Sequence, residues 1–184
     1  MRHIFKYTFL LTFLLLFRGL LNAQTSKLTC KNGKVEFISE APLEIIKAHS
    51  EKLIGVLDTS NHSFGFAVAV QSFYGFNSPL QRDHFNLNYL ESDKFPNIIF
   101  NGKIIEPIDY SNYGTYEVRA KGQLEIHGIK QDKIIKGRLI VSRNSIIAEA
   151  EFYVNLSDFE ITVPKVVKEK VALDIDVKVK TELK

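Results

Sequence analysis

A strict alternation runs through Tyr116-Glu117-Val118-Arg119-Ala120-Lys121-Gly122-Gln123-Leu124-Glu125-Ile126. The even positions are apolar or small, and the odd positions between them are charged or polar. Because successive side chains of a β-strand point to opposite faces, this period of two predicts a long strand with one face in a core and the other in water.

The same period recurs in the C-terminal half of the chain, over residues 148–155 and 171–179. Near the N-terminus, Asn32-Gly33 stands between the segments 28–30 and 35–38, which predicts a two-residue hairpin turn. Long antiparallel strands without regularly alternating helices predict an all-β fold, either a closed barrel or a sandwich.

One segment departs from the strand pattern. Helical spacing relates Leu80, His84, Leu87 and Leu90, and Ser78 is a suitable cap with a proline directly after it. We therefore expect a short helical insertion near residues 78–91. Such an insertion would cover one end of a barrel as a lid or plug.

The N-terminus has the features of a secretory signal peptide. Residues 8–17 form an apolar run that ends at Arg18, and the small residue Ala23 follows. This run is about half the ~20 residues that a membrane span needs. We predict a signal peptide over residues 1–23 and one domain over 24–184, with no transmembrane anchor after processing. An uncleaved anchor is the alternative.

The mature chain is close to electrically neutral. The full sequence has 24 Lys and Arg against 21 Asp and Glu, and Arg2, Lys6 and Arg18 belong to the expected signal peptide. Removing these three leaves 21 residues of each sign, so no excess positive charge remains for a nucleic-acid backbone. A single cysteine, Cys30, allows no internal disulfide.

Residues that carry chemistry are sparse. The histidines of the mature chain have no recognised metal-ligand spacing, and no nucleophile, phosphate-loop or dinucleotide motif is present. His127 falls on the polar face of its strand by parity. The cluster Arg82-Asp83-His84 is either a site or a group that pins a short helix to the barrel. We expect no enzyme, no metal and no cofactor.

The inward faces of the expected strands carry many small residues, namely Gly102, Ala120, Gly122, Gly137, Ala148 and Ala150. A barrel of eight strands is either filled by its side chains or, where some are small, holds one ligand. Glycines also mark strand kinks and bulges. The residues alone leave a filled barrel and a ligand-holding barrel equally open.

Several motifs, in order, resemble the YceI-like family: Gln81-Arg82-Asp83-His84-Phe85, Tyr89-Leu90-Glu91-Ser92-Asp93-Lys94-Phe95-Pro96, Ile99-Phe100-Asn101-Gly102, Gly122-Gln123-Leu124-Glu125-Ile126-His127-Gly128-Ile129 and Phe152-Tyr153-Val154-Asn155-Leu156-Ser157-Asp158-Phe159-Glu160-Ile161. The segments 41–44 and 58–73 indicate a divergent branch. The resemblance implies an extended, lipocalin-like antiparallel barrel of about eight strands, exported to the periplasm or secreted, that binds a polyisoprenoid or other long-chain amphiphilic lipid.

The resemblance also implies that apolar wall residues hold the ligand. Within residues 64–70 one face carries Phe64, Phe66 and two valines and the other carries glycine and alanines, so the pattern allows either face inward, and we choose the phenylalanine face. By strand phase the wall residues are then Phe37, Phe64, Phe66, Val68, Phe100, Tyr116, Val118, Leu124, Ile126, Phe152, Val154 and Ile175. Arg82 and His84 would form a polar mouth. The alternative function is a ligand-free, filled barrel that acts as an envelope stress or interaction protein.

Overall fold

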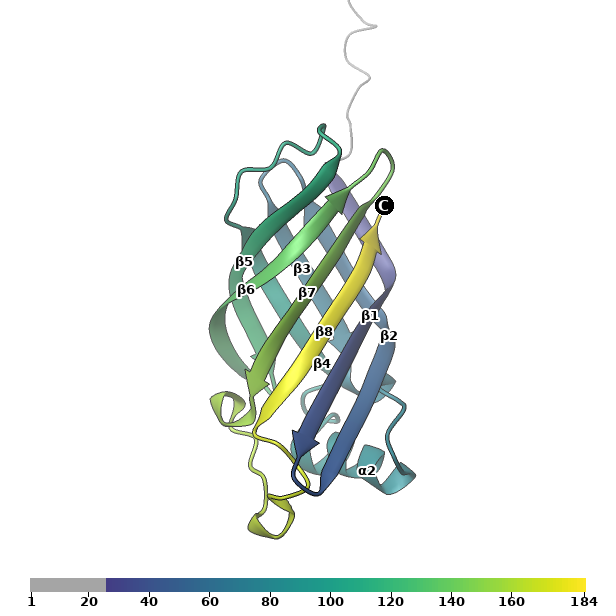
Figure 1. The fold of residues 1–184 in the computed structure, drawn as a ribbon, viewed down its shortest axis with the longest axis vertical. Helices are drawn as coiled ribbons and strands as arrows, with labels where there is room; N and C mark the ends of the chain where they lie inside the picture. Colours follow the sequence, from purple (N-terminus) through teal and green to yellow (C-terminus); the bar gives the residue numbers. More distant parts are fainter. Residues whose placement is uncertain (1–25) are drawn as a thin grey trace, which may run out of the picture.

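The computed structural model describes residues 26–184 as a closed, antiparallel barrel in which each strand pairs with its neighbour in sequence and the last pairs with the first (Figure 1). The all-β, lipocalin-like prediction is therefore confirmed. The expected signal peptide lies outside the described residues. The strands are β1 (Lys27–Ala41), β2 (Glu44–Asp58), β3 (Ser63–Ala69), β4 (Asn97–Ile104), β5 (Gly114–Ile126), β6 (Ile129–Val141), β7 (Ile146–Asn155) and β8 (Asp174–Leu183).

In the strand β5, the alternating sequence pattern corresponds to one face in the barrel interior and one face outside. Its even side chains face the barrel interior, where Val118, Leu124 and Ile126 are buried, and it pairs with β6 along its whole length. His127 and Gly128 make the two-residue turn between these strands, both with positive φ (53° and 74°). This conformation matches the twist of the strands. The prediction that His127 lies on a strand face is therefore wrong.

The predicted hairpin at Asn32-Gly33 is also wrong, because β1 continues through it. The pairing of β1 with β2 shifts register on either side of Gly33, as at a β-bulge. A side chain at Gly33 would stand 2.6 Å from the Thr181 hydroxyl on β8. The glycine therefore permits a close approach of two strands rather than a reversal of the chain.

The last strand begins later and ends later than the period of residues 171–179 predicts. The backbone N–H of Val171 donates to the Val167 carbonyl, which holds the start of this run in a turn. From Asp174 onward the predicted phase is correct, since Ile175 is buried and Val177 is partly buried against the core. The same inward face continues to Leu183, which is fully buried.

The predicted helical insertion is present and lies across one end of the barrel (Figure 1). Its segments are the 3-10 turn η2 (Val70–Ser72), the α-helix α2 (Pro79–His84) and the π-turn η3 (Phe85–Tyr89). The Ser78 hydroxyl accepts a hydrogen bond from the Gln81 N–H and so caps α2, as the sequence predicts. The Arg82 guanidinium donates to the Gln71 carbonyl at 3.0 Å, which pins α2 to the end of β3.

The two ends of the barrel differ. One end, which we call the closed end, comprises the start of β1, the turn at residues 59–62, the loop 105–113, the turn 142–145 and the C-terminus. There the backbones of Thr29 and Lys184 pair, and Ile108, Val141 and Ile146 form a buried layer. Burial raises the pKa of the nearby Tyr110 to about 12.

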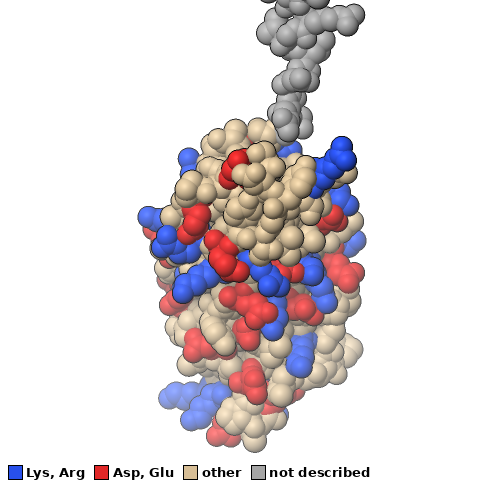
Figure 2. Space-filling view, turned by 45° about the horizontal axis from the view of Figure 1, so that its top comes forward, with Lys and Arg blue, Asp and Glu red and all other residues tan. Residues whose placement is uncertain are grey.

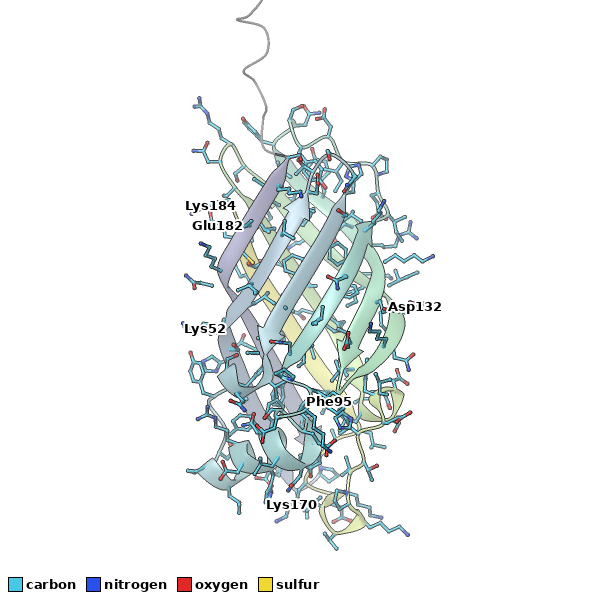
Figure 3. The ribbon with its side chains drawn as sticks, turned by 180° about the vertical axis from the view of Figure 1, so that it is seen from behind. Lys52, Phe95, Asp132, Lys170, Glu182 and Lys184 are labelled. Carbon is cyan, nitrogen blue, oxygen red and sulfur yellow. The ribbon has the colours of Figure 1, made fainter. Side chains whose placement is uncertain are left out.

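The opposite end, which we call the helical end, comprises the turn 42–43, the insertion 70–96, the turn 127–128 and the segment 156–173 (Figure 1). The last of these contains the 3-10 turns η4 (Leu156–Phe159) and η5 (Lys165–Val167). Figure 3 places Lys170 at this end, and Glu182 and Lys184 at the closed end. Between the ends, basic and acidic side chains are mixed over the barrel wall in the view of Figure 2.

Candidate ligand cavity

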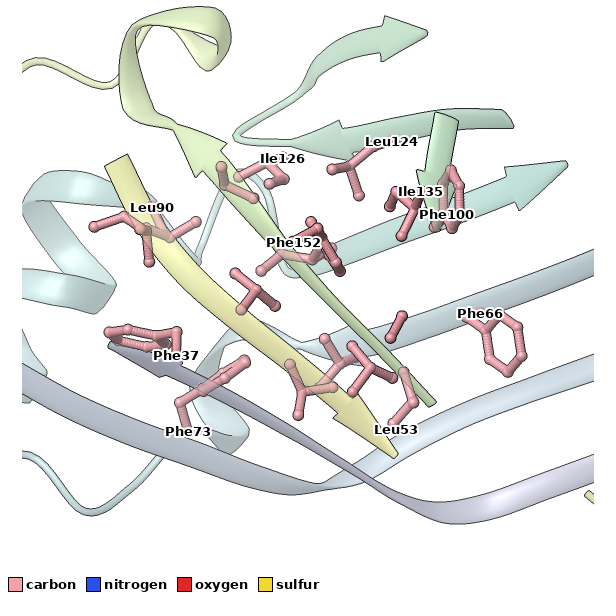
Figure 4. Close-up of a pocket in the computed structure, with 18 of the residues that line it drawn as sticks. Phe37, Leu53, Phe66, Phe73, Leu90, Phe100, Leu124, Ile126, Ile135 and Phe152 are labelled. Atoms are coloured by element: carbon pink, nitrogen blue, oxygen red, sulfur yellow. The ribbon is translucent and has the colours of Figure 1, made fainter. Parts of the chain in front are cut away.

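The barrel encloses an apolar cavity with a volume of about 420 Å³. All the predicted wall residues except Tyr116 line it, and Figure 4 shows several of them pointing into the same space. The predicted inward face of residues 64–70 is also found, since Phe64, Phe66 and Val68 line the cavity. Their contact with a ligand stays a prediction.

Tyr116 faces inward but lies beyond the cavity. Its hydroxyl donates to the Asn112 carbonyl at 2.8 Å, and its ring packs against the buried layer of the closed end. The cavity therefore stops before this residue. It extends from the closed-end layer toward the helical end.

The small inward residues have two different roles. Ala120, Gly137, Ala148 and Ala150 line the cavity, so their missing side-chain atoms leave room in it. Gly102 and Gly122 do not line the cavity but face each other across β4 and β5. A side chain on either glycine would meet the backbone of the opposing strand, so this pair allows a close strand approach.

Aromatic rings gather where the cavity reaches the helical end. Phe37 of β1 lies with its ring centroid 5.4 Å from that of Phe85 and 5.6 Å from that of Phe73, while Phe76 lies 5.2 Å from Phe85. All four line the cavity. Of these, strand periodicity identified Phe37 alone, because the other three lie in the irregular insertion.

The helical stripe expected in the insertion is wrong in part. Leu80 and Leu87 are 61% and 60% exposed, whereas Phe85, Tyr89 and Leu90 face the cavity. The reason is the π-turn, in which the Leu90 N–H donates to the Phe85 carbonyl five residues earlier. This wider turn rotates the inward face away from the ordinary helical spacing.

Polar side chains at the helical end surround the outer part of the cavity, which we call the mouth. Ser39, Glu44, Gln81, His84 and Lys170 line it. The Gln81 side-chain amide donates to the Glu44 carboxylate, which joins α2 to the start of β2. Of the two residues predicted to form a polar mouth, the structure brings His84 to the cavity, whereas Arg82 is turned to the Gln71 carbonyl.

Deep in the cavity wall lies the polar side chain of Thr181 of β8, whose neighbours along the inner face are apolar or small. Arg138 and Glu149 also line the cavity and pair with each other. The Thr181 hydroxyl is buried, and its polar contact is with the Cys30 thiol, a weak hydrogen-bonding group. The buried Cys30 lies nearby on β1, and burial raises the pKa of its thiol. The cavity wall is therefore suited to binding an apolar chain rather than to chemistry.

His127 joins three loops of the helical end outside the cavity. Its Nε2 lies 3.1 Å from the Glu91 carboxylate, its Nδ1 lies 3.3 Å from the Phe159 carbonyl, and Phe95 packs edge-on against its ring. Hydrogen bonds from Lys94 and His127 lower the pKa of Glu91. This group has the character of a structural tie.

The described part of the chain contains neither a cluster of metal ligands nor a helix that could span a membrane. Across residues 26–184, no group of three or more His, Cys, Asp or Glu side chains is arranged to hold a metal ion. Over the same residues, no helix has both the length and the apolar character needed to cross a membrane.

Comparisons with known proteins agree with this geometry. A family model described as a YceI-like domain matches residues 22–182. The chain is similar to a polyisoprenoid binding domain from Saccharophagus degradans implicated in plant cell wall breakdown, with a TM-score of 0.72 and 10% identity over 88% of this chain and 99% of that one. It is also similar to BcnA of Burkholderia cenocepacia, with a TM-score of 0.68 and 14% identity over 82% and 95% of the two chains.

A third similar structure is a YceI protein from Campylobacter jejuni, with a TM-score of 0.55 and 17% identity over 73% of this chain and 82% of that one. At such identities the structural likeness establishes the fold alone. A search of the curated proteins found no match.

Proposed function

Because the chain belongs to the YceI-like family, we propose that it is an exported binding protein that holds a polyisoprenoid or another long-chain amphiphilic lipid in its barrel, for transport or sequestration. Export to the periplasm or the medium follows from the expected signal peptide over residues 1–23, with 24–184 as the single mature domain. The polyisoprenoid binding domain among its structural neighbours supports this ligand class.

The observation that carries the proposal is the size and apolar character of the cavity. At about 24 cal/mol per Å³, a dry and unfilled space of about 420 Å³ would cost ~10 kcal/mol. The net stability of a whole domain is of the same size, ~5–15 kcal/mol. Water would not fill this space well, because a buried water needs two to four polar partners and the inner face of the deep wall is apolar apart from Thr181. An apolar ligand is therefore the occupant that best matches the wall.

The volume also indicates how much of a lipid fits. An apolar cavity of about 150 Å³ holds one benzene molecule, so about 420 Å³ has room for roughly 17 carbon atoms. The polar residues Ser39, Gln81 and His84 line the mouth, so the polar head of an amphiphile belongs there. A longer polyisoprenoid would then keep part of its chain outside the deep cavity.

The alternative from the sequence, a filled barrel without a ligand, needs side chains that close the interior. Ala120 on β5 and Ala148 and Ala150 on β7, the two strands that flank β6, leave that space open. This observation favours the lipid-binding function.

Native mass spectrometry of the protein purified from its own cell envelope tests the proposal. We expect a bound lipid mass that disappears after organic extraction, and renewed uptake when the extracted protein is mixed with farnesol or solanesol. A single unliganded mass from the envelope, together with no uptake of either alcohol, would contradict the proposal.

A further inference from the structure

Exposed apolar side chains gather around the mouth of the cavity. Leu43 is 66% exposed, Leu80 is 61% exposed and Val166 is 91% exposed. Each is the sequence neighbour of a residue that lines the mouth or the outer cavity, namely Glu44, Gln81 and Val167. Large apolar side chains on a protein surface mark an interaction site when they form a patch.

Hydrogen bonds hold these three segments together as one rim. The Leu43 N–H donates to the Glu169 carbonyl at 2.8 Å, which joins the turn 42–43 to the segment that follows η5. The side chain of Asn77 donates to the Ile45 carbonyl at 3.0 Å, which joins the same turn to the start of α2. Ile45 is itself exposed. The turn 42–43 therefore lies between η5 and α2, and the apolar residues of all three ring the mouth.

The rim also carries positive charge around its most exposed apolar residue. Lys165, Lys168 and Lys170 flank Val166, and within residues 26–184 none of these three lysines forms an ion pair. Glu169 stands between them and is exposed. The segment 165–170 thus has a net positive charge. On the barrel wall, by contrast, Glu149 pairs with both Arg138 and Lys180.

We propose that the helical end docks on an anionic lipid bilayer, with Leu43, Leu80 and Val166 among the headgroups and the lysines of 165–170 against the lipid phosphates. Apolar side chains beside lysines are the combination that binds a protein to the surface of a membrane without crossing it. The mouth then faces the bilayer, so a lipid chain passes into the cavity without crossing water. This inference rests on the proposed lipid-binding function.

Sedimentation with vesicles tests the docking. The probes are vesicles of phosphatidylcholine alone and vesicles that also contain phosphatidylglycerol. We expect binding to the anionic vesicles that weakens as salt is added, because exposed charges are screened. Changing Lys165, Lys168 and Lys170 together to Gln should reduce this binding at least tenfold, since each lysine near an anionic surface contributes roughly fivefold.

The matched lysine control lies toward the other end of the barrel. Lys27, Lys31 and Lys103 are exposed lysines of β1 and β4 that form no ion pair in the described structure. Their change to Gln alters the net charge by the same amount and should change vesicle binding by less than about twofold. Equal losses in the two triple variants would overturn the docking surface, because net charge alone would then explain the binding.

A second pair of variants tests the apolar rim. Leu43→Asp combined with Val166→Asp should abolish vesicle binding, whereas Ile105→Asp combined with Tyr113→Asp at the closed end should not. All four side chains are exposed, so the urea midpoints of both variants should stay close to wild type. Vesicle binding that survives the rim change would overturn the inference. So would a concentration-dependent dimer that the rim change disrupts in the absence of vesicles.

Farnesol uptake from solution separates this inference from the proposed function. The Leu43→Asp, Val166→Asp variant should take up farnesol as wild type does, because neither changed residue lines the cavity. Normal uptake with unaltered vesicle binding in this variant would refute the docking alone. Absence of uptake in the wild-type protein would refute the lipid cavity, whatever the vesicles show.

Discussion

Enlarging two small residues of the cavity wall distinguishes a ligand-holding barrel from a close-packed one. Ala120 of β5 and Ala150 of β7 both line the cavity, and Ala150 faces Gly137, which has no side chain to obstruct a larger neighbour. Ala120→Leu with Ala150→Leu adds six carbon atoms. At roughly 25 Å³ per carbon these fill about 150 Å³, or about a third of the cavity volume of about 420 Å³.

The two interpretations predict opposite changes in the stability of the lipid-free protein when both alanines are replaced by leucine. Filling about 150 Å³ of otherwise unfilled space would stabilise it by at most ~3–4 kcal/mol, and side-chain entropy reduces that gain. In a close-packed interior the same changes would instead cost ~1–3 kcal/mol each. Because the cavity is present, we expect unchanged or increased stability together with weaker uptake of farnesol.

Urea melts and farnesol titrations of extracted protein measure both quantities. The matched control is Ala67→Leu on β3, whose side chain is on the outer face and does not line the cavity. This control should leave uptake unchanged. A double variant that is destabilised by 2 kcal/mol or more, with wild-type uptake, would refute the reasoning.

Three further predictions test other parts of the structure by urea unfolding. Leu124→Asp should lower the free energy of unfolding by several kcal/mol because it buries an unpaired carboxylate. Gln123→Asp on the outer face should change it by no more than ~0.5 kcal/mol. Equal losses of stability in the two variants would show that the strand phase is wrong. Thr181→Val should leave stability unchanged or raise it by up to ~1 kcal/mol, since it removes a buried hydroxyl whose contact with the Cys30 thiol is only a weak hydrogen bond. A clear loss of stability would mean that the hydroxyl is well bonded. The pKa of Glu91 is lowered, chiefly by Lys94 and then by His127, so its stabilising effect is present above its usual pKa and is lost as the pH falls through the lowered value. Glu91→Gln should therefore lower the urea midpoint at pH 7, and the loss should shrink as the pH falls through the acid range. A loss that does not change with pH would contradict this.

The alternation in the sequence was sufficient to predict the barrel wall. Along β5 every even side chain faces inward, because one buried face specifies both the phase and the register of a strand. The same rule placed Phe152 correctly at the cavity. For residues 64–70 it left both faces open, and the choice of the phenylalanine face agrees with the position of Phe66. It could not show how much space remains, since the depth of a cavity depends on side chains from several strands that meet across the barrel.

The errors occurred where local signals and the long-range pairing disagree. Asn32-Gly33 has the composition of a turn, but β1 pairs with β2 on both sides of it, so the pair is accommodated as a bulge. His127-Gly128 is a true two-residue turn, and Gly128 together with the strands on either side was the signal for it. The inward faces of Phe73 and Phe76 follow from no period, because these residues lie in irregular chain between β3 and α2.

The structure also indicates which end of the barrel opens when a ligand exchanges. The closed end is sealed by side chains such as Leu57 and Leu183, at 2% and 0% exposure, and opening it would expose apolar surface to water. At the helical end, by contrast, α2 and η3 contain no buried residue, and α2 is held by polar contacts such as those from Gln81 to Glu44 and from Arg82 to the Gln71 carbonyl. Water replaces such contacts at small net cost. Segments with exposed hydrogen bonds and few buried apolar side chains open most readily, so displacing α2 and η3 requires less free energy than opening the closed end.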